Sequence, residues 1–201
     1  MYTLYFSPGA CSLAIQAVLH HLDQEVNAID VNKVDNYADI NPVGAVPVLI
    51  DGETTLKEGG AILLHLLEKH QSRLLPASGS ARQKAIHDLM FANSTVHPAY
   101  ARLFFIGNNI SDEKAKHEAL NATALELNKL WGIIEKELAD KPFLGGNEPA
   151  VADFLLAVYS TWGTYFPIDV VFGEQTYAMI KAIHALPSYQ KALTAQQQAS
   201  V

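Results

Sequence analysis

The sequence predicts an α/β + all-α fold, with an α/β region over residues 1–77 followed by a helical bundle over residues 81–201. Short apolar runs typical of strands alternate with helical patterns over the first 70 or so residues, whereas the later residues show only helical patterns. Between them, residues 75–80 are small and polar and include a proline, as in a linker. We therefore expect two domains.

The N-terminal elements are predicted in the order βαβ and then ββα. A strand over residues 2–6, a helix over 11–22 and a strand over 26–31 form a βαβ unit, so these two strands should be parallel. A short helix or loop over 35–40 and a turn at 41–44 follow. The remaining elements are a strand at 46–50, a tight turn at Asp51-Gly52, a strand at 54–56 and a helix from Gly59 or Gly60 to about His70.

The C-terminal region is predicted to be entirely helical. Its helices cover residues 81–107, 112–139, 152–163 and 175–185. The second has a single apolar stripe, formed by Ala119, Leu120, Leu127, Leu130, Ile134 and Leu138. The glutamines at 196–198 form a short biased tract, which we expect to be a frayed tail.

Composition and charge exclude several classes of function. The chain is 49% hydrophobic and 17% charged, which is typical of a globular protein, and its net charge is −7. Residues 1–77 hold four Lys and Arg against nine Asp and Glu, and neither half has the clustered cations that nucleic acids require. No secretory signal follows Met1, and no window approaches the roughly 18 apolar residues of a membrane span. We expect a cytoplasmic protein.

Cys11 is the single cysteine of the chain, which excludes an internal disulfide and a multi-cysteine metal site and fits a reducing compartment. His65 and His70 are five residues apart on one predicted helix, so they do not share a face as a metal-binding pair would. We expect no bound metal.

Cys11 also lies where the first predicted strand turns into the first helix. Unpaired backbone N–H groups and the positive end of the helix dipole at such a position favour the thiolate and lower the thiol pKa. Cys11 is therefore a candidate reactive thiol. The alternative is that it is a small, inert, buried hydrophobic residue.

Three motifs in order carry a resemblance that extends over essentially the full length. They are Ser7-Pro8-Gly9-Ala10-Cys11-Ser12-Leu13-Ala14, Val46-Pro47 at the third strand, and Glu58-Gly59-Gly60-Ala61-Ile62 at the following helix. With an all-helical region after them, they resemble the cytosolic glutathione S-transferases, and within these the bacterial beta class. The resemblance implies a thioredoxin-like N-terminal domain, a homodimer, and transfer of glutathione to small hydrophobic electrophiles in detoxification.

The resemblance also implies a glutathione-binding set of Lys33, Val46, Pro47, Glu58 and Gly59. A cis Val46-Pro47 bond would turn the Val46 backbone toward the cysteinyl part of glutathione. Glu58 would meet the glutamyl ammonium, and the N–H groups at the helix start would meet its carboxylate. Lys33 would meet the glycyl carboxylate. The alternatives are an ordinary strand-initiating proline, helix charge compensation by Glu58 and a solvated lysine.

Cys11 and His97 are the implied catalytic residues. In the family, the helix that contains His97 brings a histidine over the cysteine, where it can donate to a thiolate or stabilise it. The alternative is a core or surface histidine. The chain departs from the family pattern at three positions: Gly59 replaces a serine, Pro98 a lysine and Ala150 a capping serine or threonine. The aromatic residues Tyr100, Phe104, Phe105, Tyr159, Trp162, Tyr165 and Phe166 are candidates for an apolar pocket or for the core.

Three functional hypotheses follow. In the first, the protein conjugates the thiol of glutathione, its co-substrate, to small hydrophobic electrophiles. In the second, Cys11 performs glutathione-dependent thiol-disulfide exchange, with glutathione as the resolving thiol. The third is a non-catalytic binding protein, favoured by Gly59 and Pro98 because each removes a polar contact to the ligand.

Overall fold

The computed structural model describes residues 1–199 and contains a four-stranded mixed sheet in strand order β2-β1-β3-β4. β1 (Tyr2–Phe6) pairs in parallel with β2 (Val26–Asp30) and antiparallel with β3 (Val48–Asp51), which pairs with β4 (Thr54–Lys57). The predicted βαβ-ββα order is confirmed. The third strand begins at Val48, two residues later than predicted.

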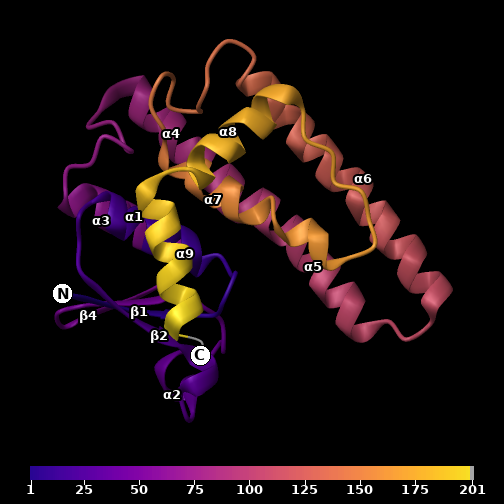
Figure 1. Ribbon diagram of the computed structural model, residues 1–201, viewed down its shortest axis with the longest axis horizontal. Helices are drawn as coiled ribbons and strands as arrows, with labels where there is room; N and C mark the ends of the chain where they lie inside the picture. The colour runs from indigo at the N-terminus through magenta and orange to yellow at the C-terminus, as the bar shows by residue number, and fades with distance from the viewer. Residues whose placement is uncertain (200–201) are drawn as a thin grey trace.

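α1 (Ser12–His21) lies between the sheet and the helical part of the molecule (Figure 1). Every residue of α1 from Ser12 to Leu19 is buried, because the helix contacts β1 and α3 (Gly59–Lys69) as well as α7 (Val151–Tyr159) and α9 (Pro187–Ala199). Between β2 and β3 the chain forms a 3₁₀ turn, η1 (Val31–Lys33), and the short helix α2 (Tyr37–Ile40). Contacts with the sheet and with the helices together fix the position of α1.

All the elements described after α3 are helical, as predicted. They are α4 (Gly79–Phe91), the π-helical η2 (Ala92–Val96), α5 (His97–Asn109), α6 (Glu113–Glu137), α7 (Val151–Tyr159), the 3₁₀ turn η3 (Trp162–Tyr165), α8 (Glu174–His184) and α9 (Pro187–Ala199). The helix predicted at 81–107 is therefore interrupted by a π-helical segment. The boundary between domains at residues 77–81 stays a prediction.

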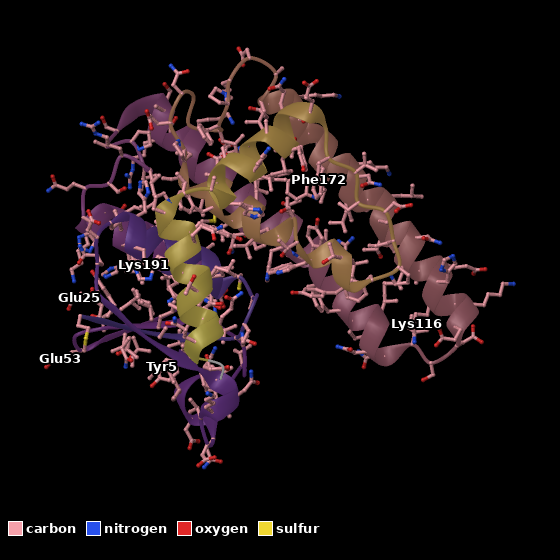
Figure 2. The ribbon with its side chains drawn as sticks, in the orientation of Figure 1. Tyr5, Glu25, Glu53, Lys116, Phe172 and Lys191 are labelled. Atoms are coloured by element: carbon pink, nitrogen blue, oxygen red, sulfur yellow. The ribbon has the colours of Figure 1, made fainter. Side chains whose placement is uncertain are left out.

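α5 and α6 form a hairpin that projects from the rest of the molecule (Figure 1). Trp131 of α6 donates its indole N–H to the buried Tyr100 hydroxyl of α5 at 2.9 Å. Phe172, in the segment that runs beside α6, packs edge to face on the same indole (Figure 2). None of the described helices is long and apolar enough to cross a membrane.

The C-terminal glutamines correct one expectation. Residues 196–198 belong to α9, which packs along α1 and reaches β2, so they are not a frayed tail. Gln196 is buried and donates its side-chain N–H to the side-chain oxygen Oε1 of Gln16 at 3.0 Å. The spacing of Tyr189, Ala192 and Gln196 places all three on one buried face of the helix.

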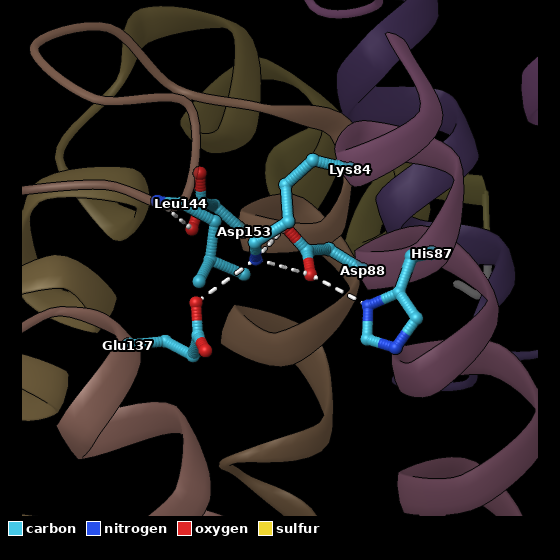
Figure 3. Close-up of polar contacts among 6 residues, drawn as sticks. All are labelled: Lys84, His87, Asp88, Glu137, Leu144 and Asp153. Carbon is cyan, nitrogen blue, oxygen red and sulfur yellow. Dashed lines mark hydrogen bonds and ion pairs between the residues drawn. The ribbon is translucent and has the colours of Figure 1, made fainter. Parts of the chain in front are cut away.

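Two sets of polar contacts lie near the N-terminal end of α7, one in the segment before this helix and one that joins α4 to α6 (Figure 3). Asp153 is fully buried and accepts the backbone N–H groups of Ala150 at 2.7 Å and Leu144 at 3.1 Å. Lys84 pairs with both Asp88 and Glu137. Ala150 has no side-chain oxygen, so Asp153 makes only its own half of a capping box.

Candidate functional site

Cys11 lies at the start of α1. The turn after β1 places it at the boundary between the sheet and the helices. Gly9 in this turn has φ +71°, a conformation that favours glycine, and its carbonyl accepts the Trp162 indole N–H at 2.8 Å. The Cys11 thiol donates to the Val46 carbonyl in a long, weak contact of 3.7 Å. The sulfur therefore faces the backbone of the segment that leads into β3, and it shares a cavity with side chains from the helices.

Burial raises the pKa of the Cys11 thiol to about 11, and the nearby Glu58 carboxylate acts in the same direction. Backbone N–H groups at the helix start lower the thiol pKa, as we expected, but the effect of burial is larger. The expectation of a lowered thiol pKa is therefore wrong. At neutral pH, Cys11 is a protonated thiol and a hydrogen-bond donor.

The Val46-Pro47 peptide bond is cis, which confirms that expectation. Val46 and Pro47 lie in the segment that leads into β3, and both line the smaller of two cavities that meet at Cys11. The Val46 carbonyl is the acceptor of the Cys11 thiol. The sulfur and the backbone that the resemblance assigns to the cysteinyl group therefore lie side by side.

The start of α3 combines an exposed carboxylate with backbone that lines the smaller cavity. Glu58 is the N-cap residue and has φ +71°, a strained conformation for a residue with a side chain. A Cβ atom at Gly59 would lie 3.2 Å from Oδ1 of Asn93, and one at Gly60 would lie 3.0 Å from Met90. The two glycines let the helix that contains Asn93 approach closely, so the Asn93 amide stands where a side chain at position 59 would otherwise be.

His97 begins α5, immediately after the π-helical turn, and its ring is half-buried against aromatic rings. The ring centroids of Tyr159 and Trp162 lie 5.3 and 5.2 Å from that of His97. Burial lowers the pKa of the imidazole, and Glu58 opposes this only in part. His97 is therefore neutral at neutral pH and can accept a proton. Pro98 lies in the first turn of α5, where a missing N–H is tolerated.

Two cavities meet at Cys11, Ala45, Val46 and His97. The smaller, of about 370 Å³, is lined by polar groups that include Glu58, Gly59 and Asn93. The larger, of about 630 Å³, is walled by aromatic rings, those of Phe104, Trp162 and Tyr165. A carboxylate and amides thus lie on one side and aromatic rings on the other, with a thiol and an imidazole where the two cavities meet.

The structure brings six of the seven predicted site residues to the smaller cavity: Cys11, Val46, Pro47, Glu58, Gly59 and His97. Lys33 is exposed at the end of η1 and lines neither cavity. The functional role of each of the seven stays a prediction.

Sequence reasoning missed Asn93, because only the packing of η2 against α3 brings its amide to Gly59. It also could not tell which of the aromatic candidates line a cavity and which belong to the core. Tyr100 and Tyr159 are fully buried, and Phe105 is largely exposed, so only Phe104, Trp162 and Tyr165 of that set line the larger cavity. Within residues 1–199, no cluster of three or more His, Cys, Asp or Glu side chains is arranged to hold a metal ion.

Comparison with known proteins gives consistent matches. A family model for the glutathione S-transferase N-terminal domain matches residues 1–74. A sphingomonad glutathione S-transferase solved in complex with glutathione is 33% identical, with a TM-score of 0.85 over 97% of this chain and 98% of that one.

Two further relatives cover nearly the whole chain. The beta class glutathione S-transferase of Sphingomonas chungbukensis is 32% identical, with a TM-score of 0.84 over 96% of this chain and 98% of that one. Glutathione S-transferase GstA of Escherichia coli O157:H7 is 26% identical, and the match covers 96% of this chain and 98% of the relative.

Proposed function

The chain belongs to the glutathione S-transferase superfamily, near the bacterial beta class, and on this basis we propose that it conjugates glutathione to small hydrophobic electrophiles. The observation that supports this most is the pair of cavities that meet at Cys11 and His97. A polar tripeptide fits the smaller cavity and an apolar electrophile the larger. The reacting sulfur then lies at the join, where both substrates are held in position for reaction.

The glutamyl end of glutathione carries an ammonium and a carboxylate, and the smaller cavity offers a partner for each. Glu58 pairs with the ammonium, and the N–H groups at the start of α3 bind the carboxylate. Asn93 provides the side-chain hydrogen bond that Gly59 cannot make, since its amide stands at that position. The backbone of Val46 holds the cysteinyl part, as in strand addition.

The pKa shifts favour conjugation over disulfide exchange. Because the pKa of Cys11 is raised to about 11, very little thiolate is present at neutral pH to attack a disulfide. A neutral thiol can instead donate a hydrogen bond to the glutathione thiolate. The neutral His97 imidazole takes the proton that the glutathione thiol loses. The glutathione sulfur then forms the C–S bond, and the leaving group departs with its electron pair.

Calorimetric titration with glutathione, followed by an assay with a chlorodinitrobenzene-type electrophile, tests this function. We expect saturable binding and conjugation, with about tenfold weaker binding in Asn93→Ala, because a hydrogen bond to a charged group is lost. Thr95→Ala is the matched control, since Thr95 is exposed and lines neither cavity. No detectable heat at millimolar glutathione would contradict the proposal and favour the non-catalytic hypothesis.

A homodimer and a cytoplasmic location complete the proposal. The family is usually dimeric, and size-exclusion chromatography with light scattering tests the assembly directly. A mass near that of one 21.9 kDa chain would contradict the dimer.

A further inference from the structure

Two side chains of the α2 region donate to a single backbone oxygen, the carbonyl oxygen of Ala45. The Tyr37 hydroxyl donates to it at 3.0 Å, and the buried Asn41 donates its side-chain N–H at 2.7 Å. A carbonyl oxygen has two lone pairs, so both are engaged. The two donors therefore fix the direction in which the Ala45 carbonyl points.

Asn41 also shapes the turn that leads to Ala45. Its Oδ1 atom accepts the Val43 N–H at 3.4 Å, and its backbone carbonyl accepts the Gly44 N–H at 2.8 Å. Gly44 has φ +73°, a conformation that favours glycine. One residue therefore holds the turn at three points, Val43, Gly44 and Ala45.

The direction of the Ala45 carbonyl also sets the direction of the Val46 N–H. Both groups belong to one peptide unit, which is planar and trans, so they point in opposite directions. The Val46 N–H therefore points away from Tyr37 and Asn41, and none of residues 1–199 accepts it. Because Val46 lines both cavities, this donor is available to a ligand.

We propose that Tyr37 and Asn41 are positioning residues, which hold the Ala45-Val46 peptide so that the Val46 N–H meets the cysteinyl carbonyl of glutathione. This inference rests on the proposed function, in which the Val46 backbone pairs with the cysteinyl part. A donor that is fixed before binding loses little freedom when the ligand arrives, which favours affinity. In this role both side chains act on glutathione through the backbone of Val46.

Tyr37→Phe removes one donor and keeps the ring, which packs on Tyr5 at a centroid distance of 5.9 Å. We expect the KM and the Kd for glutathione to rise about two- to fivefold, because one neutral hydrogen bond is lost and Asn41 still holds the carbonyl. The kcat and the KM for the electrophile should not change, since the Val46 N–H pairs with glutathione in the ground state and the transition state alike. A merely structural role would instead lower the active fraction, and with it kcat, at an unchanged KM.

Asn41→Asp is the second variant. Aspartate keeps an oxygen that can accept the Val43 N–H, but it places a carboxylate oxygen where the donor to Ala45 was. The carboxylate repels the Ala45 carbonyl, so we expect glutathione to bind about tenfold more weakly or worse. Because Tyr37→Phe introduces no charge, a loss of affinity in both variants separates lost positioning from repulsion of the ligand.

Tyr5→Phe is the matched control, since Tyr5 packs against Tyr37, lines neither cavity and makes no hydrogen bond through its hydroxyl within residues 1–199. Its KM for glutathione should equal that of the parent. If the parent binds and conjugates glutathione, parental affinity in both Tyr37→Phe and Asn41→Asp would overturn this inference alone. A parent with no detectable glutathione binding would overturn the proposed function and this inference with it.

Discussion

Asp153 and Tyr159 lie near opposite ends of α7, and both side chains are fully buried. Asp153 accepts two backbone N–H groups, and the neighbouring Asp88 is paired with Lys84 (Figure 3). The Tyr159 hydroxyl has no partner within the described residues, and Cys11, where the two cavities meet, has one weak contact. The polar groups around the N-terminal end of α7 are thus satisfied within the chain, whereas the Cys11 thiol at the cavities keeps capacity for a ligand.

The largest effect is expected from Asp153→Ala. The substitution leaves the N–H groups of Ala150 and Leu144 buried without an acceptor, which should cost about 2–4 kcal/mol of unfolding free energy. Denaturant unfolding measures the loss, and glutathione affinity of the folded fraction should not change. Asp35→Ala, at an exposed position, should change stability by about 0.5 kcal/mol or less. A loss of unfolding free energy below about 1 kcal/mol for Asp153→Ala would contradict the claim that Asp153 stabilises the fold by satisfying buried backbone groups.

Glu58→Gly tests the claim that polar groups at the cavities serve the ligand, because stability should rise while glutathione binding weakens. Glycine adopts φ +71° without strain, so the unfolding free energy should rise by about 1 kcal/mol. Loss of the carboxylate should weaken glutathione binding at least about tenfold, since a charged hydrogen bond is removed.

Gln71→Gly is the matched control for Glu58→Gly. Gln71 also has a positive φ, of 49°, but it follows the other end of α3 and lines neither cavity. It should gain similar stability with unchanged glutathione affinity in calorimetry. Equal affinity in both variants would argue against Glu58 as a ligand for the ammonium.

The smallest effect is expected from Ala150→Ser, which completes the capping box at Asp153. A serine oxygen at the N-cap can accept the Asp153 backbone N–H, and such caps contribute about 0.5–2 kcal/mol. Thermal or denaturant unfolding should show this gain without a change in conjugation rate. A destabilised variant would show that the buried site at Ala150 has no room for the hydroxyl.

The order of elements could be predicted from the sequence because it depends on local signals. Alternating apolar residues and turns marked β1 to β4, and helical spacing marked α6 and α8. α9 was missed because its glutamines resemble a polar tail, and only the burial of Gln196 against α1 shows their role.

The candidate site was predictable where a motif carries it and not where long-range packing decides it. Cys11, Glu58 and His97 come from motifs, and all three line the smaller cavity. The predicted direction of the Cys11 pKa shift was wrong. A helix start and its dipole can be recognised in the sequence, whereas burial of the thiol by helices distant in the sequence cannot. Asn93 likewise depends on the contact between η2 and the start of α3.

A crystal structure with glutathione tests the central claim most directly. We expect glutathione in the smaller cavity, with its glutamyl end at Glu58 and Asn93 and its sulfur within hydrogen-bonding distance of the Cys11 sulfur, with no bond between the two sulfurs. Glutathione bound elsewhere, a ligand sulfur turned away from Cys11, or a disulfide between the two would contradict the claim.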